Sequence, residues 1–325
     1  MIGGRKLAAI MSPMPRLAPR MAPVRRALAT HRVLRDFSAA ALNHDAMTGS
    51  SYENYSVTSQ TYDSFRKPIS LDLFRDAFGT VAERLSKPTK KLDLLDAGCG
   101  SGNYLDAVKD DVGSIAGLEF NEGMIGKAVA KLPSADIQQG SITSMPYAAA
   151  SFDVIITTQV LHHLEKGGGQ EFSNVALAAQ EVFRCLRPGG AWVVQTQTPE
   201  QHLDGFWWAP VVPDAALTLS KHFAPLPKFE SICRSAGFGD FSSAIPPEPL
   251  VRLDKYLDIE GPFNQAFRNA DSTWSLATED ELKTGLAMLR AKIDAGEAAA
   301  WQAEREALRA KIGQTTTVVA TKPMV

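Results

Sequence analysis

The chain of 325 residues has few cysteines and no cysteine pattern. Its three cysteines, Cys99, Cys185 and Cys233, lie far apart, which excludes a disulfide framework and a zinc-binding spacing. The first 37 residues also lack an apolar run long enough for a secretory signal or a membrane-spanning helix. We therefore expect no metal site and no membrane span.

Acidic residues are almost absent from residues 1–37, which hold eight basic residues and a single acid, Asp36. An arginine-rich, acid-poor start is typical of an organellar transit peptide. Residues 35–38 are similar to a mitochondrial processing site with cleavage after Phe37. The expected location is thus the mitochondrial matrix; a plastid, or a cytoplasmic protein with a basic tail, is the alternative.

The charge balance also argues against one class of partner. The full chain has 34 basic and 36 acidic residues, and 26 and 35 would remain after removal of residues 1–37, a net charge near −9. Nucleic acid is a poor partner for such a surface. We expect a small-molecule partner and no nucleic acid.

What the sequence does contain is a strand that runs directly into a glycine-rich turn. The apolar strand 92–95 ends at Asp96, and alternate glycines follow at Gly98, Gly100 and Gly102. Glycine lets a backbone bend sharply and approach a ligand closely. The spacing G-x-G-x-G, with an acid ahead of it, differs from the dinucleotide fingerprint G-x-G-x-x-G. A nicotinamide-dependent oxidoreductase is therefore disfavoured.

A second expected strand, 114–119, ends in Glu119, 21 residues beyond Gly98. A carboxylate at this place can accept hydrogen bonds from both ribose hydroxyls of a nucleotide. Residues 94–102 resemble motif I of the class I S-adenosylmethionine-dependent methyltransferases, and residues 151–164 resemble the matching segment of the type 11 subfamily. The resemblance implies S-adenosylmethionine as cofactor and methyl transfer as activity.

The resemblance also implies a set of cofactor-binding residues that follow the strands. Ser141 stands where the family usually has aspartate, and Ile142 would form an apolar wall beside adenine, with Met124 facing the same ring. The full expected set is Asp96, Gly98, Cys99, Gly100, Gly102, Glu119, Phe120, Met124, Ser141, Ile142, Thr158 and Gln159.

Two neighbouring histidines, His162 and His163, are the candidate catalytic residues, with His202 behind them in the sequence. A general base is needed only if the acceptor must lose a proton. The alternative is that these histidines serve packing and contacts in the cofactor pocket.

The order of elements from residue 92 to residue 197 is strand, helix, strand, helix, strand, strand, helix, strand, with long crossovers that favour parallel pairing. Residues 315–322 are β-branched and predict a last strand. We expect an α/β fold: a doubly wound, mostly parallel seven-stranded Rossmann-like methyltransferase sheet with helices on both faces and a helical cap or lid.

The expected domains are the transit peptide 1–37, lid helices and a linker over 38–90, and a methyltransferase domain over 91–325. This domain includes a substrate cap at about 199–312, where residues 278–294 and 297–312 have helical spacing. Aromatic and basic side chains outside the cofactor motifs are the expected substrate or lid residues: Tyr55, Tyr62, Arg66, Trp207 and Trp208. Trp207 and Trp208 can instead form the core of the cap.

Three functions compete at this point. The first is an organellar methyltransferase that acts on a small molecule, with quinone C-methylation as a narrower variant. The second is a catalytically inactive scaffold or assembly factor that still binds S-adenosylmethionine. The third is the nicotinamide-dependent oxidoreductase that the glycine spacing disfavours.

Overall fold

The computed structural model describes residues 65–165 and 171–325 of the chain. The expected transit peptide, most of the expected lid segment, and Tyr55 and Tyr62 lie outside the described residues. No helix of the described part has the length and apolarity needed to cross a membrane.

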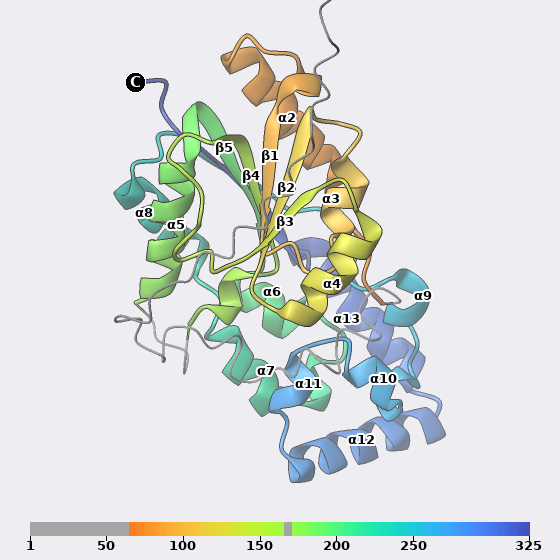
Figure 1. Ribbon diagram of the computed structural model, residues 1–325. Helices are drawn as coiled ribbons and strands as arrows, with labels where there is room; N and C mark the ends of the chain where they lie inside the picture. Colours follow the sequence, from red (N-terminus) through yellow and green to blue (C-terminus); the bar gives the residue numbers. More distant parts are fainter. Residues whose placement is uncertain (1–64, 166–170) are drawn as a thin grey trace, which may run out of the picture. The chain divides into compact units, whose positions relative to one another are not determined.

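The centre of the fold is a seven-stranded sheet with the order β3-β2-β1-β4-β5-β7-β6 (Figure 1). The first five strands are parallel to their neighbours, whereas β7 is antiparallel to both β5 and β6. This mostly parallel arrangement confirms the predicted fold class. The strands are β1 (Asp93–Ala97), β2 (Ser114–Glu119), β3 (Asp136–Gln139), β4 (Phe152–Thr158), β5 (Leu186–Thr196), β6 (Phe241–Ala244) and β7 (Thr316–Thr321).

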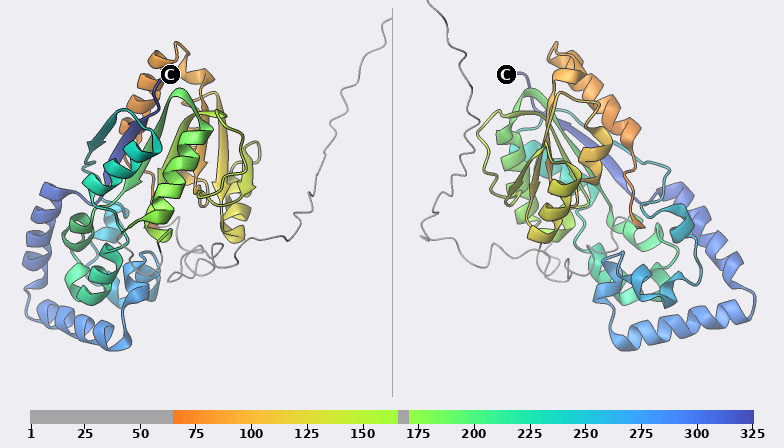
Figure 2. Two further views of the ribbon diagram at one scale, coloured as in Figure 1. Left: turned by 90° about the vertical axis from the view of Figure 1, so that its left-hand side faces the viewer. Right: turned by 45° about the vertical axis from the view of Figure 1, so that its right-hand side comes forward.

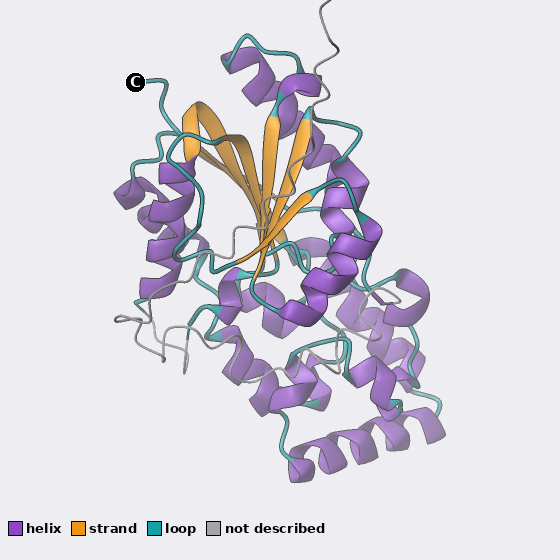
Figure 3. Ribbon diagram, viewed as in Figure 1, coloured by secondary structure: helices purple, strands orange, loops and turns teal. Residues whose placement is uncertain are grey.

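The central strands are mostly apolar because helices cover both faces of the sheet. Successive side chains of a strand point to opposite faces, so Leu94 packs with one layer of helices and Leu95 with the other. Figures 2 and 3 show the two layers. One layer contains α2 (Leu71–Arg84), α3 (Asn103–Val108) and α4 (Glu122–Lys131); the other contains α5 (Ser173–Cys185) and α8 (Leu226–Ala236).

Helix α2 falls inside the range 38–90 that was expected to form a lid and a linker. Its apolar residues, among them Phe74, Phe78 and Val81, are buried against Leu94 and Val154 of the sheet. This helix is therefore a part of the sheet's own core, where it contributes apolar burial.

The remaining helices form a region beyond the carboxyl ends of β4 and β5 (Figure 1). An aromatic core holds this region together, and Trp207 and Trp208 are 0% and 1% exposed within it. The helices are α6 (Pro199–Asp204), α7 (Pro213–Ser220), α9 (Leu253–Tyr256), α10 (Gln265–Arg268), α11 (Thr273–Leu276), α12 (Glu279–Asp294) and α13 (Ala298–Ile312). Of the two roles considered for the tryptophans, packing in the cap is the one that the structure displays.

Candidate functional site

The turn between β1 and α3 is shaped by positive φ angles at alternate glycines, 94° at Gly98, 53° at Gly100 and 80° at Gly102. This left-handed region costs glycine nothing and strains other residues. The N–H groups of Gly98 and Cys99 both donate to the carbonyl of Leu118, at 2.7 and 3.0 Å. These two hydrogen bonds hold the turn against β2. We call this turn, residues 98–102, the cradle.

Glu119 ends β2 and points into this cradle. Its Oε2 accepts the N–H of Gly100 at 2.8 Å, and its Oε1 accepts the N–H groups of Phe120 at 2.9 Å and Asn121 at 2.8 Å. Burial raises the pKa of Glu119, and the three donors oppose this effect. Each carboxylate oxygen has two lone-pair positions, so Oε1 is filled by its two donors and Oε2 keeps one position for a ligand while it holds the turn.

Asp96, one residue before the end of β1, is 1% exposed. Neither of its carboxylate oxygens has a hydrogen-bond partner among residues 65–165 and 171–325. Burial, and then the charge of Glu119, raise the pKa of Asp96 well above its ordinary value. A buried carboxylate without donors is costly. A ligand group that donates hydrogen bonds or carries positive charge would offset this cost, and Asp96 is therefore the clearest sign of a ligand at this edge.

The predicted adenine wall lies at the ends of β2 and β3. Met124 and Ile142 are 3% and 5% exposed, and α4 starts after Asn121, whose Oδ1 accepts the N–H of Met124 at 3.1 Å. The hydroxyl of Ser141 is 2.8 Å from Thr143 Oγ1. Met124 follows β2, whereas Ser141 and Ile142 follow β3, and the role of all three beside a cofactor stays a prediction.

The side chain of Cys99 packs against Gly117. A side chain at position 117 would overlap the sulfur of Cys99. The cysteine is 6% exposed, and burial raises the pKa of its thiol. A buried thiol of raised pKa is a poor nucleophile, so Cys99 acts through the shape of the turn.

The two histidines after β4 belong to an aromatic cluster. His162 is 5% exposed, and its ring centre lies 3.9 Å from that of His163 and 4.6 Å from that of Phe223. Burial lowers the pKa of His162 far below its ordinary value and that of His163 to about 3. Groups that bind a proton this weakly are poor general bases at neutral pH. Their catalytic role stays a prediction, which these pKa shifts disfavour.

Arg66, the one predicted lid residue other than the tryptophans that the structure describes, is bound to the helical region. Its Nη2 donates to the carbonyl of Ala270 at 3.0 Å and to Asp271 Oδ2 at 3.1 Å. Three residues later, the N–H of Ile69 donates to Tyr104 Oη at 3.1 Å, and that hydroxyl donates to Gln195 Oε1 at 3.0 Å. The segment from Arg66 to Ile69 thus connects the helical region with the carboxyl edge of the sheet.

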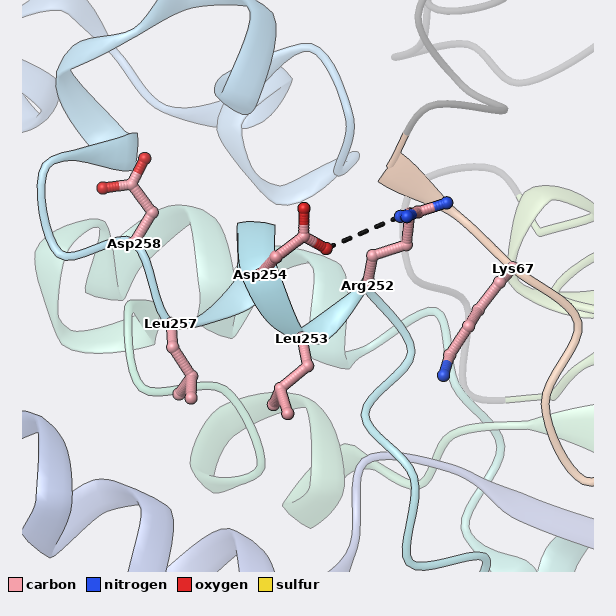
Figure 4. Close-up of a pocket in the computed structure, with 6 residues that line it drawn as sticks. All are labelled: Lys67, Arg252, Leu253, Asp254, Leu257 and Asp258. Carbon is pink, nitrogen blue, oxygen red and sulfur yellow. Dashed lines mark ion pairs between the residues drawn. The ribbon is translucent and has the colours of Figure 1, made fainter.

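A separate groove of about 830 Å³ lies beside α9. Figure 4 shows the side chains of Leu253 and Leu257 pointing the same way, with Arg252 3.5 Å from Asp254. The lining residues are Lys67, Arg252, Leu253, Asp254, Leu257 and Asp258. They include none of the predicted site residues, so the groove is distinct from the glycine turn.

Several residues at the carboxyl edge of β4 and β5 were not predicted from sequence. Gln197 and Thr273 contact His202, and Phe223 packs between the rings of His162 and His202. The helical region supplies Thr273 from a position about 75 residues after Gln197. No local motif marks these residues, since only the packing of the chain brings them together.

Comparison with known proteins agrees with this geometry. Residues 95–194 match the family model of the methyltransferase domain, type 11. A Mycolicibacterium smegmatis protein named as a probable S-adenosylmethionine-dependent methyltransferase is 34% identical over 116 residues, 36% of this chain and 42% of the relative. The demethylmenaquinone methyltransferase of Lactococcus lactis is 27% identical over 64% of this chain and 82% of its own length.

One solved structure shares the fold over most of the described chain. It is an Anabaena variabilis protein named as a methyltransferase of an antibiotic biosynthesis pathway, with a TM-score of 0.62 and 19% identity over 79% of this chain and 98% of that one. Residues 95–194, at the centre of this fold, form a class I S-adenosylmethionine-dependent methyltransferase domain of type 11. The predicted family is thus confirmed, whereas the match spans less than half the length of the Mycolicibacterium relative.

Proposed function

We propose that the chain transfers a methyl group from S-adenosylmethionine to a small-molecule acceptor by direct in-line displacement. The proposal is carried by two carboxyl groups at the ends of the neighbouring strands β1 and β2, the buried Asp96 and the half-buried Glu119, which flank the glycine turn. Glu119 Oε2 would accept a ribose hydroxyl. Asp96 lacks donors of its own, and the ammonium group at the methionine end of the cofactor would supply them.

When bound, the cofactor supplies a methyl group that its sulfonium makes electrophilic. The task left to the protein is then to bind, orient and exclude water, and orientation alone can contribute about 7–11 kcal/mol in favourable systems. Val160 packs directly over Gly98. This contact fixes the glycine turn on one side of the site. The weakly basic His162 and His163 favour an acceptor that needs no strong base from the protein.

A small acceptor is favoured by the acidic composition of residues 38–325, which suits nucleic acid poorly. Quinone C-methylation is the second candidate, and the match to most of the demethylmenaquinone methyltransferase of Lactococcus lactis favours it. An inactive scaffold would bind the cofactor without turnover. An assay with methyl-labelled S-adenosylmethionine, a metabolite extract and a demethylated quinone separates the three, because only an enzyme produces labelled product.

Calorimetry tests the cofactor claim directly. We expect the full chain to bind S-adenosylmethionine and to bind NADH no better than a buffer control. Binding of NADH alone would overturn the proposal. Loss of S-adenosylmethionine binding on substitution of Glu119 or Asp96, but not of the exposed Glu122 nearby, supports the two assigned carboxylates.

We also propose that residues 1–37 direct the protein to mitochondria, since eight of them are basic and one is acidic. These residues fused to a fluorescent protein should give mitochondrial fluorescence. Replacing the arginines with glutamine should make the fluorescence diffuse, and a plastid pattern for the unaltered fusion would contradict the mitochondrial assignment.

A further inference from the structure

Gln159 has a strained backbone at the carboxyl end of β4. Its φ is 54°, in the left-handed region that residues other than glycine rarely adopt. Its N–H donates to the carbonyl of Gln195 at 2.9 Å, which holds the strained residue at the edge of β5. Strain of this kind gathers at functional sites, where the surrounding structure enforces it.

The side chains of Gln159 and Val160 lie on opposite sides of this loop. Val160 packs on Gly98 of the glycine turn, whereas Gln159 contacts Gln197, which follows β5. In the sheet order, β1 and β5 lie on opposite sides of β4. The amide of Gln159, which the resemblance placed among the cofactor-binding residues, is therefore directed toward Gln197 and away from the glycine turn.

A chain of contacts sets the orientation of this amide. Gln159 Oε1 accepts a hydrogen bond from Gln197 Nε2 at 3.3 Å, and Gln197 Oε1 lies 2.9 Å from His202 Nδ1. His202 Nε2 is 3.4 Å from Thr273 Oγ1, and this hydroxyl donates to Asp271 Oδ1 at 2.6 Å. Gln197 Oε1 can only accept and the hydroxyl proton of Thr273 goes to Asp271, so we assign the proton of the neutral imidazole to Nδ1, and Nε2 contacts Thr273 without a hydrogen bond.

In this arrangement the oxygen of the Gln159 amide accepts a hydrogen bond, whereas its nitrogen has no acceptor. Gln159 Nε2 is buried and has no acceptor among the described residues. A buried N–H group without an acceptor is unfavourable, so a ligand oxygen at this place would gain affinity from it. An ammonium group would gain nothing, since it presents only hydrogens.

We propose that Gln159 orients the methyl acceptor, by donating from Nε2 to an oxygen of an acceptor molecule that bears a carbonyl or carboxylate group. Gln197 and His202 are positioning residues, which hold the amide with its nitrogen toward the acceptor. The inference rests on the proposed methyl-transfer function, because that function requires a second ligand beside the cofactor.

The first experiment uses the full chain loaded with S-adenosylhomocysteine and three probes of one skeleton: benzoate, acetophenone and benzylamine. Ligand-observed NMR measures their affinities. We expect benzoate and acetophenone to bind the unaltered protein and benzylamine to bind at least fivefold more weakly. Binding of benzylamine equal to that of benzoate overturns the inference.

The second experiment compares Gln159→Leu with Gln180→Leu, the same change at an exposed position of α5. Gln159→Leu should weaken benzoate binding by about tenfold, the size of one hydrogen bond to a charged group, and Gln180→Leu should not change it. Calorimetry with S-adenosylmethionine should give the same affinity for both variants. If Gln159→Leu weakens cofactor and probe equally, the amide serves the cofactor and the inference fails.

Gln159→Gly separates a binding role from a structural one. Glycine adopts a φ of 54° without strain, so the melting temperature should stay equal or rise while benzoate affinity falls. A lower melting temperature with unchanged benzoate affinity would instead make Gln159 a structural residue.

Gln197→Glu tests the positioning residues. The new carboxylate cannot donate to Gln159, so the Gln159 amide should turn and donate to it, which leaves Oε1 facing the acceptor. We expect the preference to reverse, with benzylamine bound more tightly than benzoate. An unchanged preference contradicts the contact chain.

Failure of the unaltered protein to bind S-adenosylmethionine would refute the proposed function itself, whereas intact cofactor binding with no effect at Gln159 refutes only this inference.

Discussion

The glycine turn and the helical region beyond the sheet differ in the kind of buried polar group that lacks a partner among the described residues: a carboxyl group at the turn, and a neutral indole N–H, that of Trp274, in the helical region. At the turn, Asp96 is buried with no hydrogen-bond donor among the described residues. In the aromatic core of the helical region, Trp207 Nε1 donates to the carbonyl of Tyr256, and Gln314 Nε2 donates to that of Gly205 at 2.9 Å. The difference teaches that the turn keeps an acidic group without donors, which suits a ligand that donates hydrogen bonds, whereas the fold itself satisfies Trp207 and Gln314 of the helical region.

The largest effect should follow from breaking the aromatic core. Trp208 is 1% exposed and packs against Tyr256, Phe267 and Trp274, so Trp208→Ala should lower the free energy of unfolding by about 3–5 kcal/mol. Denaturant unfolding measures this loss. If the two regions act separately, the affinity for S-adenosylmethionine under native conditions should change less than threefold. Leu217→Ala, at a residue that is 48% exposed, is the control, and its loss in the free energy of unfolding should be small.

The next effect should follow from a single methyl group in the glycine turn. Gly98→Ala combines a strained φ of 94° with overlap on Val160, and should cost about 2–4 kcal/mol of stability together with most of the cofactor affinity. Gly100→Ala has the strain without a neighbour within 4 Å, so its stability loss should be smaller, about 1–2 kcal/mol. Equal losses for both variants would show that Val160 is not the reason for glycine at position 98.

Substitution of either carboxylate should weaken cofactor binding, and substitution of Asp96 should at the same time stabilise the ligand-free fold. Glu119→Ala should weaken S-adenosylmethionine binding by about tenfold to a hundredfold, as expected for loss of charge-assisted hydrogen bonds. Asp96→Asn should also weaken binding, yet raise the melting temperature of the ligand-free protein, because it removes a charge that burial penalises. A lower melting temperature for Asp96→Asn would show that the fold, rather than a ligand, uses this charge.

The smallest effect, at most about 1.4 kcal/mol per pH unit for each group, concerns buried histidine. Burial lowers the pKa of His202 to about 4, whereas an unfolded histidine titrates near 6.5. The unfolded chain therefore binds more protons between these values, and stability should fall as the pH falls from about 6.5 to about 4. Unfolding at pH 7.5 and pH 5 measures this slope. His202→Gln should make it shallower, and an identical slope would contradict the assignment.

Much of the fold was predictable from local pattern. Strands β1, β2 and β4 are rich in apolar residues because both faces of the sheet are covered, and alternate glycines mark the turn from Gly98 to Gly102, where φ is positive. Strand β6 was not located in advance, since Phe241–Ala244 is short, and three of its four residues are exposed. Its place is decided by pairing with β7, which follows about 70 residues later.

By itself, the sequence determined the residues predicted to bind the cofactor. The glycine turn, Asp96 before it and Glu119 at the end of β2 lie close together in the chain, so local spacing specifies them. The acceptor side was decided by the tertiary structure. Gln159 gains its orientation from Gln197 and His202, and no spacing in the sequence predicts that these three side chains meet. Hydrogen-bond direction depends on which groups the folded chain places within about 3 Å of each other, and packing alone sets those distances.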